Sequence, residues 1–78
     1  MKLLVYSRPD CHLCDLAATE LQTAGLLQFV KGVNIEDDPE LLKRYELTIP
    51  VVHNPATQVE LGWPFTAKSL RQHFVPSE

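Results

Sequence analysis

The sequence predicts an α/β fold in which helices flank a mixed four-stranded sheet, in the order strand, helix, strand, helix, strand, strand, helix. Short apolar runs of strand length alternate with segments whose apolar residues recur at three- and four-residue intervals, the spacing of a helix face. Only a short turn separates the third and fourth strands, which predicts an antiparallel hairpin beside a parallel pair. The chain is long enough for one domain, residues 1–78.

The first strand and the first helix lie at the N-terminus. Residues 2–7, KLLVYS, are apolar enough for a strand that is buried on both faces. Arg8, Pro9 and Asp10 break this strand. A helix follows, and Gly25 stands where a C-terminal glycine is expected. The side of this helix that should face the core consists of Cys11, Cys14, Ala17, Ala18 and Leu21.

The middle of the chain predicts a second strand and a second helix. The strand is expected over residues 27–35, with a break at Gly32. Asp38 is the expected N-cap of the following helix, and Pro39 fits its first position. Its apolar side consists of Leu41, Leu42 and Tyr45. A helix joins the first two strands, so we expect them to be parallel.

A hairpin and a helix complete the chain. Residues 49–54 and 59–62 are the predicted strands of the hairpin, and Pro55 lies in its turn. Residues 66–74 then predict a helix with Thr66 as its N-cap. One face of that helix consists of Ala67, Leu70 and Phe74.

Composition and charge exclude several classes of protein. The formal net charge of −3 argues against a nucleic-acid partner, because binding a phosphate backbone needs clustered Lys and Arg. No apolar run approaches the roughly 20 residues that span a bilayer, and residues 1–10 reach polar residues too early for a secretory signal. We therefore expect a cytoplasmic monomer that binds neither nucleic acid nor membrane.

Both cysteines lie in the stretch SRPDCHLCDLA, separated by two residues. A disulfide staple would stabilise the fold little, because so short a loop hardly constrains the unfolded chain, and cytoplasmic thiols are kept reduced. A structural zinc site needs four ligands, and the chain has no second C-x-x-C or H-x-x-x-H pair, so we expect no metal site. His53 and His73 stand singly and are expected to be solvated or hydrogen-bonded. The pair indicates a redox motif.

The expected position of the cysteines at a helix start has chemical consequences. Cys11 would lie over unpaired N–H groups, whose partial positive charge stabilises a thiolate. Arg8 can add positive charge, and His12 is a candidate for tuning the same thiolate. Asp10 and Asp15 oppose this effect and are expected to act as cap or dipole partners of the helix. Cys14, one turn later, should face the core.

The segments VYSRPDCHLCDLA and IEDDPELLKRYELTIPVV resemble the glutaredoxin-like branch of the thioredoxin superfamily. The resemblance spans nearly the whole chain and implies a thioredoxin-like fold. It also implies that Cys11 is the attacking thiol and that Cys14 is the resolving thiol. A second motif, TIP at residues 48–50, implies that Pro50 is a cis-proline beside them. A cis bond there would present the free backbone N–H and C=O of Ile49 to an extended substrate, which could pair with them like an added strand.

Departures from the family pattern concern glutathione. Typical glutaredoxins have CPYC and often an aromatic residue before the first cysteine, where this chain has CHLC and Asp10. A Gly-Gly pair and acidic residues that help to hold glutathione are replaced by GWPF, in which Gly62 matches and Trp63 does not. Trp63 and Phe65 are expected to pack under the last helix. Arg8 and the Ile49 backbone still favour glutathione, so Arg8, His12, Gly62 and Trp63 are the candidates for tuning or glutathione contact.

These observations predict a thiol–disulfide oxidoreductase that reduces disulfides through a mixed-disulfide intermediate. No bound cofactor is expected; glutathione would be a co-substrate, or a protein reductase would restore the dithiol. The expected partner is a disulfide-bearing protein or glutathione. Two alternatives from other classes stay open: a thioredoxin-fold binding module without turnover, and an iron–sulfur or metal carrier that uses Cys11 with external thiols.

Overall fold

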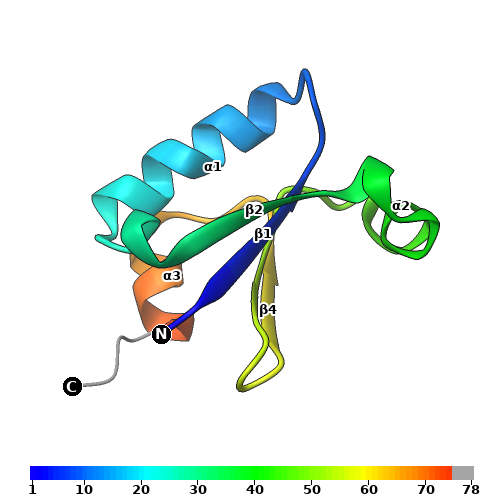
Figure 1. Ribbon diagram of the computed structural model, residues 1–78. Coiled ribbons are helices and arrows are strands. Elements are labelled where there is room, and N and C mark those ends of the chain that lie inside the picture. Colours follow the sequence, from blue (N-terminus) through cyan, green and yellow to red (C-terminus); the bar gives the residue numbers. More distant parts are fainter. Residues whose placement is uncertain (75–78) are drawn as a thin grey trace.

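A computed structural model describes residues 1–74 and contains one four-stranded sheet (Figure 1). The strands are β1 (Leu3–Ser7), β2 (Val30–Asn34), β3 (Val51–Asn54) and β4 (Val59–Gly62). Their order across the sheet is β2-β1-β3-β4, with β1 parallel to β2 and antiparallel to β3, and with β3 antiparallel to β4. The predicted mixed sheet is therefore confirmed.

Within residues 1–74, three α-helices cover the two faces of this sheet. They are α1 (His12–Thr23), α2 (Pro39–Tyr45) and α3 (Ala67–His73). Helices α1 and α3 contact each other on one face, and α2 packs on the other (Figure 1). None of the helices in residues 1–74 is long and apolar enough to cross a bilayer.

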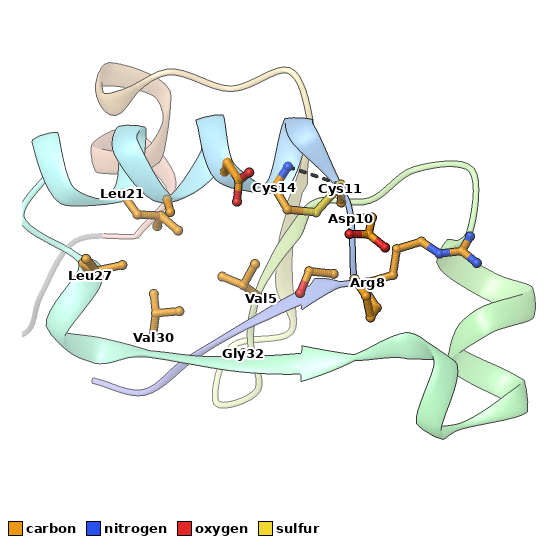
Figure 2. Close-up of a pocket in the computed structure, with 13 residues that line it drawn as sticks. Val5, Arg8, Asp10, Cys11, Cys14, Leu21, Leu27, Val30 and Gly32 are labelled. Carbon is orange, nitrogen blue, oxygen red and sulfur yellow. Dashed lines mark hydrogen bonds between the residues drawn. A yellow bond between two sulfur atoms is a disulfide. The ribbon is translucent and has the colours of Figure 1, made fainter.

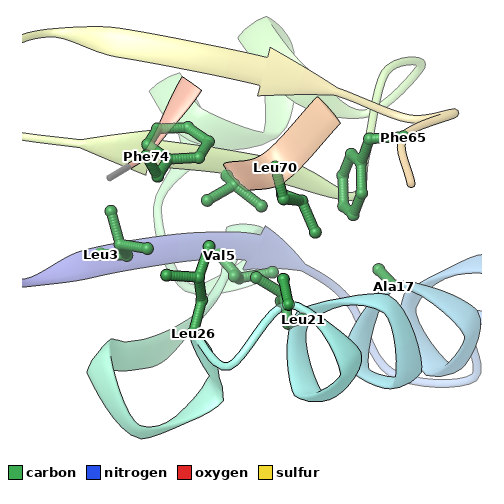
Figure 3. Packing of buried hydrophobic residues seen from close by; sticks show 10 residues of the cluster. Leu3, Val5, Ala17, Leu21, Leu26, Phe65, Leu70 and Phe74 are labelled. Atoms are coloured by element: carbon green, nitrogen blue, oxygen red, sulfur yellow. The ribbon is translucent and has the colours of Figure 1, made fainter. Parts of the chain in front are cut away.

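Alternation along the strands divides the apolar side chains into two cores. Leu3 and Val5 point toward α1 and α3, where they pack with Leu21 and Phe74 (Figure 3). Val52, the partner of Val5 in the sheet, belongs to the same cluster. The neighbouring strand residues point to the opposite face and pack under α2; this second core consists of Tyr6, Ile35, Tyr45 and Val51. Because successive strand side chains alternate in direction, the short first strand contributes to both cores at once.

The second strand is shorter than predicted, and it is not broken at Gly32. Residues Leu27–Phe29 form a 3₁₀ turn, closed by a 2.9 Å hydrogen bond from the Phe29 N–H to the Leu26 carbonyl. Leu26 is buried, so the chain must turn there before it reaches the sheet edge. Gly32 pairs with Val5 in regular register. The apolar run was correctly identified, but its first three residues connect α1 to β2.

The helix ends agree with the local signals in the sequence. Asp38 accepts a hydrogen bond from the Glu40 N–H at 2.9 Å, and Thr66 forms a capping box with Ser69. Gly25 has a φ of 76°, a value that a glycine adopts without the cost that other residues incur. In addition, the Glu20 carboxylate accepts the Ala67 N–H at 2.9 Å and so ties the start of α3 to α1.

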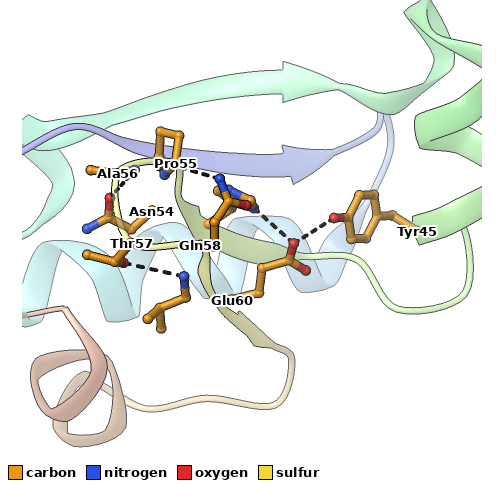
Figure 4. Close-up of polar contacts among 9 residues, drawn as sticks. Tyr45, Asn54, Pro55, Ala56, Thr57, Gln58 and Glu60 are labelled. Atoms are coloured by element: carbon orange, nitrogen blue, oxygen red, sulfur yellow. Dashed lines mark hydrogen bonds and ion pairs between the residues drawn. The ribbon is translucent and has the colours of Figure 1, made fainter.

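A polar cluster of Tyr45, Glu60 and His53 fastens the end of α2 to the hairpin, and Figure 4 shows the contact between Tyr45 and Glu60. The Tyr45 hydroxyl donates to Glu60 Oε2 at 2.9 Å, and His53 Nδ1 lies 2.9 Å from the same oxygen. His53 is thus a buried, hydrogen-bonded histidine, as expected. The Tyr6 ring stacks on Tyr45 with centroids 4.5 Å apart. Burial, followed by the Glu60 hydrogen bond, raises the pKa of Tyr45 to about 12.

The same tyrosine positions the segment that leads to Pro50. The backbone carbonyl of Tyr45 accepts the N–H groups of Thr48 and Ile49, at 2.9 and 3.0 Å, and the Thr48 hydroxyl at 3.3 Å. Three donors therefore converge on one carbonyl at the end of α2. The Glu60–Tyr45 bond and this carbonyl together hold residues 48–50 at the start of β3.

We expect Tyr45→Phe to lower the free energy of unfolding by about 1–2 kcal/mol at pH 7, because a part-buried hydrogen bond to a carboxylate is lost. The pKa of Tyr45 is raised from 10.0 to about 12 in the folded chain. The contribution of its hydroxyl to stability is therefore fully present below pH 10 and is lost as the pH rises through about 12. Urea unfolding between pH 7 and 12 should therefore show a shallower alkaline loss in the variant.

Tyr6→Phe is the matched control for the loss at neutral pH. Within residues 1–74 the Tyr6 hydroxyl makes no hydrogen bond, although its ring packs on Tyr45. Its removal should therefore cost less than that of the Tyr45 hydroxyl. A Tyr45→Phe protein that is as stable as the parent at pH 7 and equally sensitive to alkali would contradict this account.

Candidate redox site

The two cysteines lie where the chain passes from β1 into α1. β1 ends at Ser7, and the turn that follows brings Asp10 to a φ of 58°, a left-handed conformation that Asp adopts more readily than most residues. Cys11 is the N-cap of α1, and Cys14 lies one turn further along. The two sulfurs are joined in a disulfide with the Cα atoms 5.2 Å apart, within the usual range.

The sulfur of Cys11 occupies the place of an N-cap side chain. It accepts the Cys14 N–H at 3.2 Å, and the Cys11 carbonyl accepts the N–H groups of Cys14 and Asp15 at 3.2 and 3.4 Å. Asp10 was expected to cap or complement the helix, but the left-handed turn puts it outside the helix and leaves the cap to Cys11. A thiolate at Cys11 would thus lie against a backbone N–H and the positive end of α1.

Cys14 lies against a pocket and not in the core. Both cysteines are half-buried, so burial alone does not distinguish them. The pocket has a volume of about 500 Å³ and lies between α1 and strands β1 and β2 (Figure 2). Ala18, which was expected in the core, is exposed and also lines this pocket. Only Ala17 and Leu21 of the predicted helix face are fully buried.

Pro50 lies at the same end of the sheet as the cysteines. Tyr6 pairs with Val51, so the start of β3 lies beside the end of β1, from which the chain continues to Cys11. The Ile49–Pro50 peptide bond is cis, as the family resemblance implied. The Pro50 carbonyl accepts the Trp63 N–H at 3.0 Å, which brings the end of β4 to the same place.

Ile49 has one free backbone group and not the two that were expected. Its N–H is not free, because it donates to the Tyr45 carbonyl at 3.0 Å. No donor in residues 1–74 is hydrogen-bonded to the Ile49 carbonyl, so this carbonyl is the group that the segment can offer. The expectation of two free backbone groups at Ile49 is therefore wrong for the N–H, because the last turn of α2 uses it.

Arg8 and His12 are the candidates for tuning Cys11 that lie next to the cysteine pair in the sequence. Arg8 donates to Glu36 at 2.8 Å, and its side chain extends away from the cysteine pair (Figure 2). His12 is exposed at the start of α1.

The candidates at the end of β4 differ from the glutathione-binding pattern. A Cβ at Gly62 would make only ordinary contacts at 3.9 Å, so this position does not require glycine. Trp63 is half-buried and packs edge-on against Phe65, which is buried as expected.

Sequence reasoning missed the residues that shape the pocket. Gly32 and Ala18 leave space between β2 and α1, and their small size was the only available signal. No group of three or more His, Cys, Asp or Glu side chains in residues 1–74 could hold a metal ion.

A comparison with known protein families identifies the family of this chain. A family model described as glutaredoxin-like domain (DUF836) matches residues 2–75. The chain belongs to this glutaredoxin-like family. The result confirms the resemblance inferred from the two cysteines and the TIP motif.

Solved structures agree with the assignment of this glutaredoxin-like chain. The crystal structure of Northeast Structural Genomics target protein XcR50 from X. campestris is 44% identical, with a TM-score of 0.81 over 90% of this chain and 91% of that one. The solution structure of XcR50 gives 44% identity and a TM-score of 0.82, over 92% and 90%. Among proteins with a curated description, none matches. The thioredoxin-like fold is thus confirmed.

In the reduced protein, Cys11 should be alkylated at least about tenfold faster than Cys14 at pH 7, because a thiol at a helix N-terminus ionises more readily. Iodoacetamide rates between pH 5 and 9 on the single-cysteine variants Cys14→Ser and Cys11→Ser measure this difference. Equal rates, or faster labelling of Cys14, would contradict the assignment of Cys11 as the more nucleophilic thiol.

Proposed function

We propose that this glutaredoxin-like chain is a thiol–disulfide oxidoreductase in which Cys11 attacks and Cys14 resolves. One observation carries the proposal: the two sulfurs are bonded to each other at the N-terminus of α1, and Cys11 Sγ accepts a backbone N–H there. The same hydrogen bond can stabilise Cys11 as a thiolate once the disulfide is reduced. The pair can therefore alternate between two states with little movement of the helix.

The reaction transfers two electrons in two exchange steps. The Cys11 thiolate attacks one sulfur of a substrate disulfide, a mixed disulfide forms, and the other substrate sulfur leaves as a thiolate that takes up a proton. Cys14, after losing its proton, attacks the Cys11 sulfur, forms the internal disulfide and releases the second substrate thiol. Two thiols from glutathione, or a protein dithiol reductase, must then reduce Cys11–Cys14.

Several contacts favour a protein disulfide over glutathione as the substrate. The Ile49 N–H is bonded to Tyr45, so glutathione and an extended protein segment alike find only the Ile49 carbonyl there, and a protein must gain its advantage from other contacts. Arg8, the candidate for pairing with a carboxylate, is already paired with Glu36. Apolar side chains are exposed near both segments, Leu13 at 41% and Leu47 at 93%, and these suit contact with a protein.

The same chemistry bears on the compartment and partners of the chain. A dithiol that must be reduced after each turnover suits the reducing cytoplasm. The formal charge of −3 favours a disulfide-bearing protein over nucleic acid as the partner. In this scheme the chain works as a monomer, with glutathione as a slow co-substrate and a protein reductase as the main source of electrons.

A Cys14→Ser variant should retain the mixed disulfide between Cys11 and its substrate, because the resolving thiol is absent. Incubating the reduced variant with a disulfide-linked model peptide and then measuring intact mass should show one peptide added per chain. Cys11→Ser is the matched control and should add little. A Cys14→Ser protein that forms no adduct would instead favour a binding module without turnover.

Freeing Arg8 should improve the use of glutathione. Glu36→Gln removes the partner carboxylate, and the glutathione-dependent rate should rise by up to about fivefold, the scale of an exposed ion pair. Asp37 lies with Glu36 in a 3₁₀ turn, Ile35–Asp37, so Asp37→Asn changes the net charge equally and leaves the Arg8–Glu36 pair intact. A glutathione-coupled assay with a small disulfide measures the three proteins. Equal gains in both variants would contradict a specific role for Arg8.

A further inference from the structure

The pocket beside Cys14 lies on a different side of the cysteine pair from Pro50. It opens over β1 and β2, whereas Pro50 precedes β3, on the other side of β1. Figure 2 shows Cys14 and Leu21 of α1 facing Val5 and Val30 across this space. A molecule in the pocket would therefore touch the redox pair without occupying the position expected for a disulfide substrate.

Gly32 keeps this pocket open. It lies in the middle of β2, where glycine weakens a strand, and it does not have the positive φ that would require glycine. A Cβ built at Gly32 would meet no atom within 4 Å. Neither packing nor backbone conformation explains this residue. The open space above Gly32 can explain the glycine, because glycine in a strand often marks a place where a ligand approaches the backbone closely.

The volume and lining of the pocket suit a small ligand with an apolar body. About 500 Å³ is within the range of small-molecule sites. Val5 and Leu21 are buried in the core at its base, while Leu27 is 42% exposed at its edge. A ligand could thus cover apolar surface that the fold leaves in contact with water.

Charge at the rim selects the sign of the ligand. Arg8, Asp10 and Asp15 line the pocket, and Arg8 is neutralised by its 2.8 Å pair with Glu36. Within residues 1–74, neither Asp10 nor Asp15 takes part in an ion pair. Two carboxylates therefore remain at the rim without a cation.

We infer that this pocket is a binding site for a small amphiphilic cation, in which an apolar body fills the space above Gly32 and an amine or guanidinium pairs with Asp10 and Asp15. The site does not depend on the proposed disulfide exchange. It would be present even if the cysteines never turned over a substrate, since its residues are held by α1, β1, β2 and the short segments that join them.

Three probes of similar shape test both parts of the inference: 4-phenylbutylamine, 4-phenylbutanol and 4-phenylbutyrate. Titration of the ¹⁵N-labelled oxidised protein should move the amide signals of Gly32, Ala18 and Leu27. Dissociation constants on the order of millimolar are expected for ligands of this size. The amine should bind at least about threefold more tightly than the alcohol, and the carboxylate most weakly.

Substitutions test separately whether binding needs the space above Gly32 and the carboxylates of Asp10 and Asp15. Gly32→Val fills the pocket with a residue that favours strands, so binding should fall at least about tenfold without loss of folding. Lys31→Val puts the same side chain on the opposite face of β2 and should leave binding within about twofold. Replacing both Asp10 and Asp15 by Asn should bring the amine and the alcohol to similar affinities. Asn also accepts the left-handed φ at position 10.

Signal shifts that map away from Gly32 and Ala18 would place the probe elsewhere. Undiminished binding to Gly32→Val would show that the space is not used. An alcohol that binds the parent as tightly as the amine would remove the role assigned to Asp10 and Asp15.

Discussion

The cap that Cys11 forms at the start of α1 is the contact on which the rest of this site depends. Because the sulfur accepts the Cys14 N–H, the first turn of the helix and the spacing of the two cysteines are fixed together. The left-handed turn at Asp10 delivers the chain to this cap directly from the end of β1. The position of the cysteines is therefore determined by the sheet, through only three intervening residues, and not by a long flexible loop.

A second set of contacts positions the opposite side of the site. Glu60 holds the Tyr45 hydroxyl, and the Tyr45 carbonyl holds Thr48 and Ile49 ahead of Pro50. Each side is thus fastened to a different core: α1 to the one that contains Leu21, and α2 to the one that contains Tyr45. Residues 48–50 and the two cysteines are therefore each anchored through a different core.

The parts of the fold that could be predicted from the sequence are those with local causes. Asp38, Thr66 and Gly25 act within one turn of their own position, and the two cysteines needed only their helix to be recognised. The turn at residues 27–29 could not be predicted, because its apolar residues match a strand equally well and the burial of Leu26 decides between them. The bond between the Ile49 N–H and Tyr45, like the space between Gly32 and Ala18, depends on how distant elements pack.

The two edges of the sheet have a consequence for how such a molecule meets others. β2 and β4 are the edge strands; they have five and four residues and carry Lys31 and Glu60 in their interiors. Short, charged edges are poor templates for pairing with a further strand. A chain built this way can carry a half-buried cysteine pair at the end of its sheet and still resist edge-to-edge aggregation, so the end that holds the cysteines stays open to contact with other molecules.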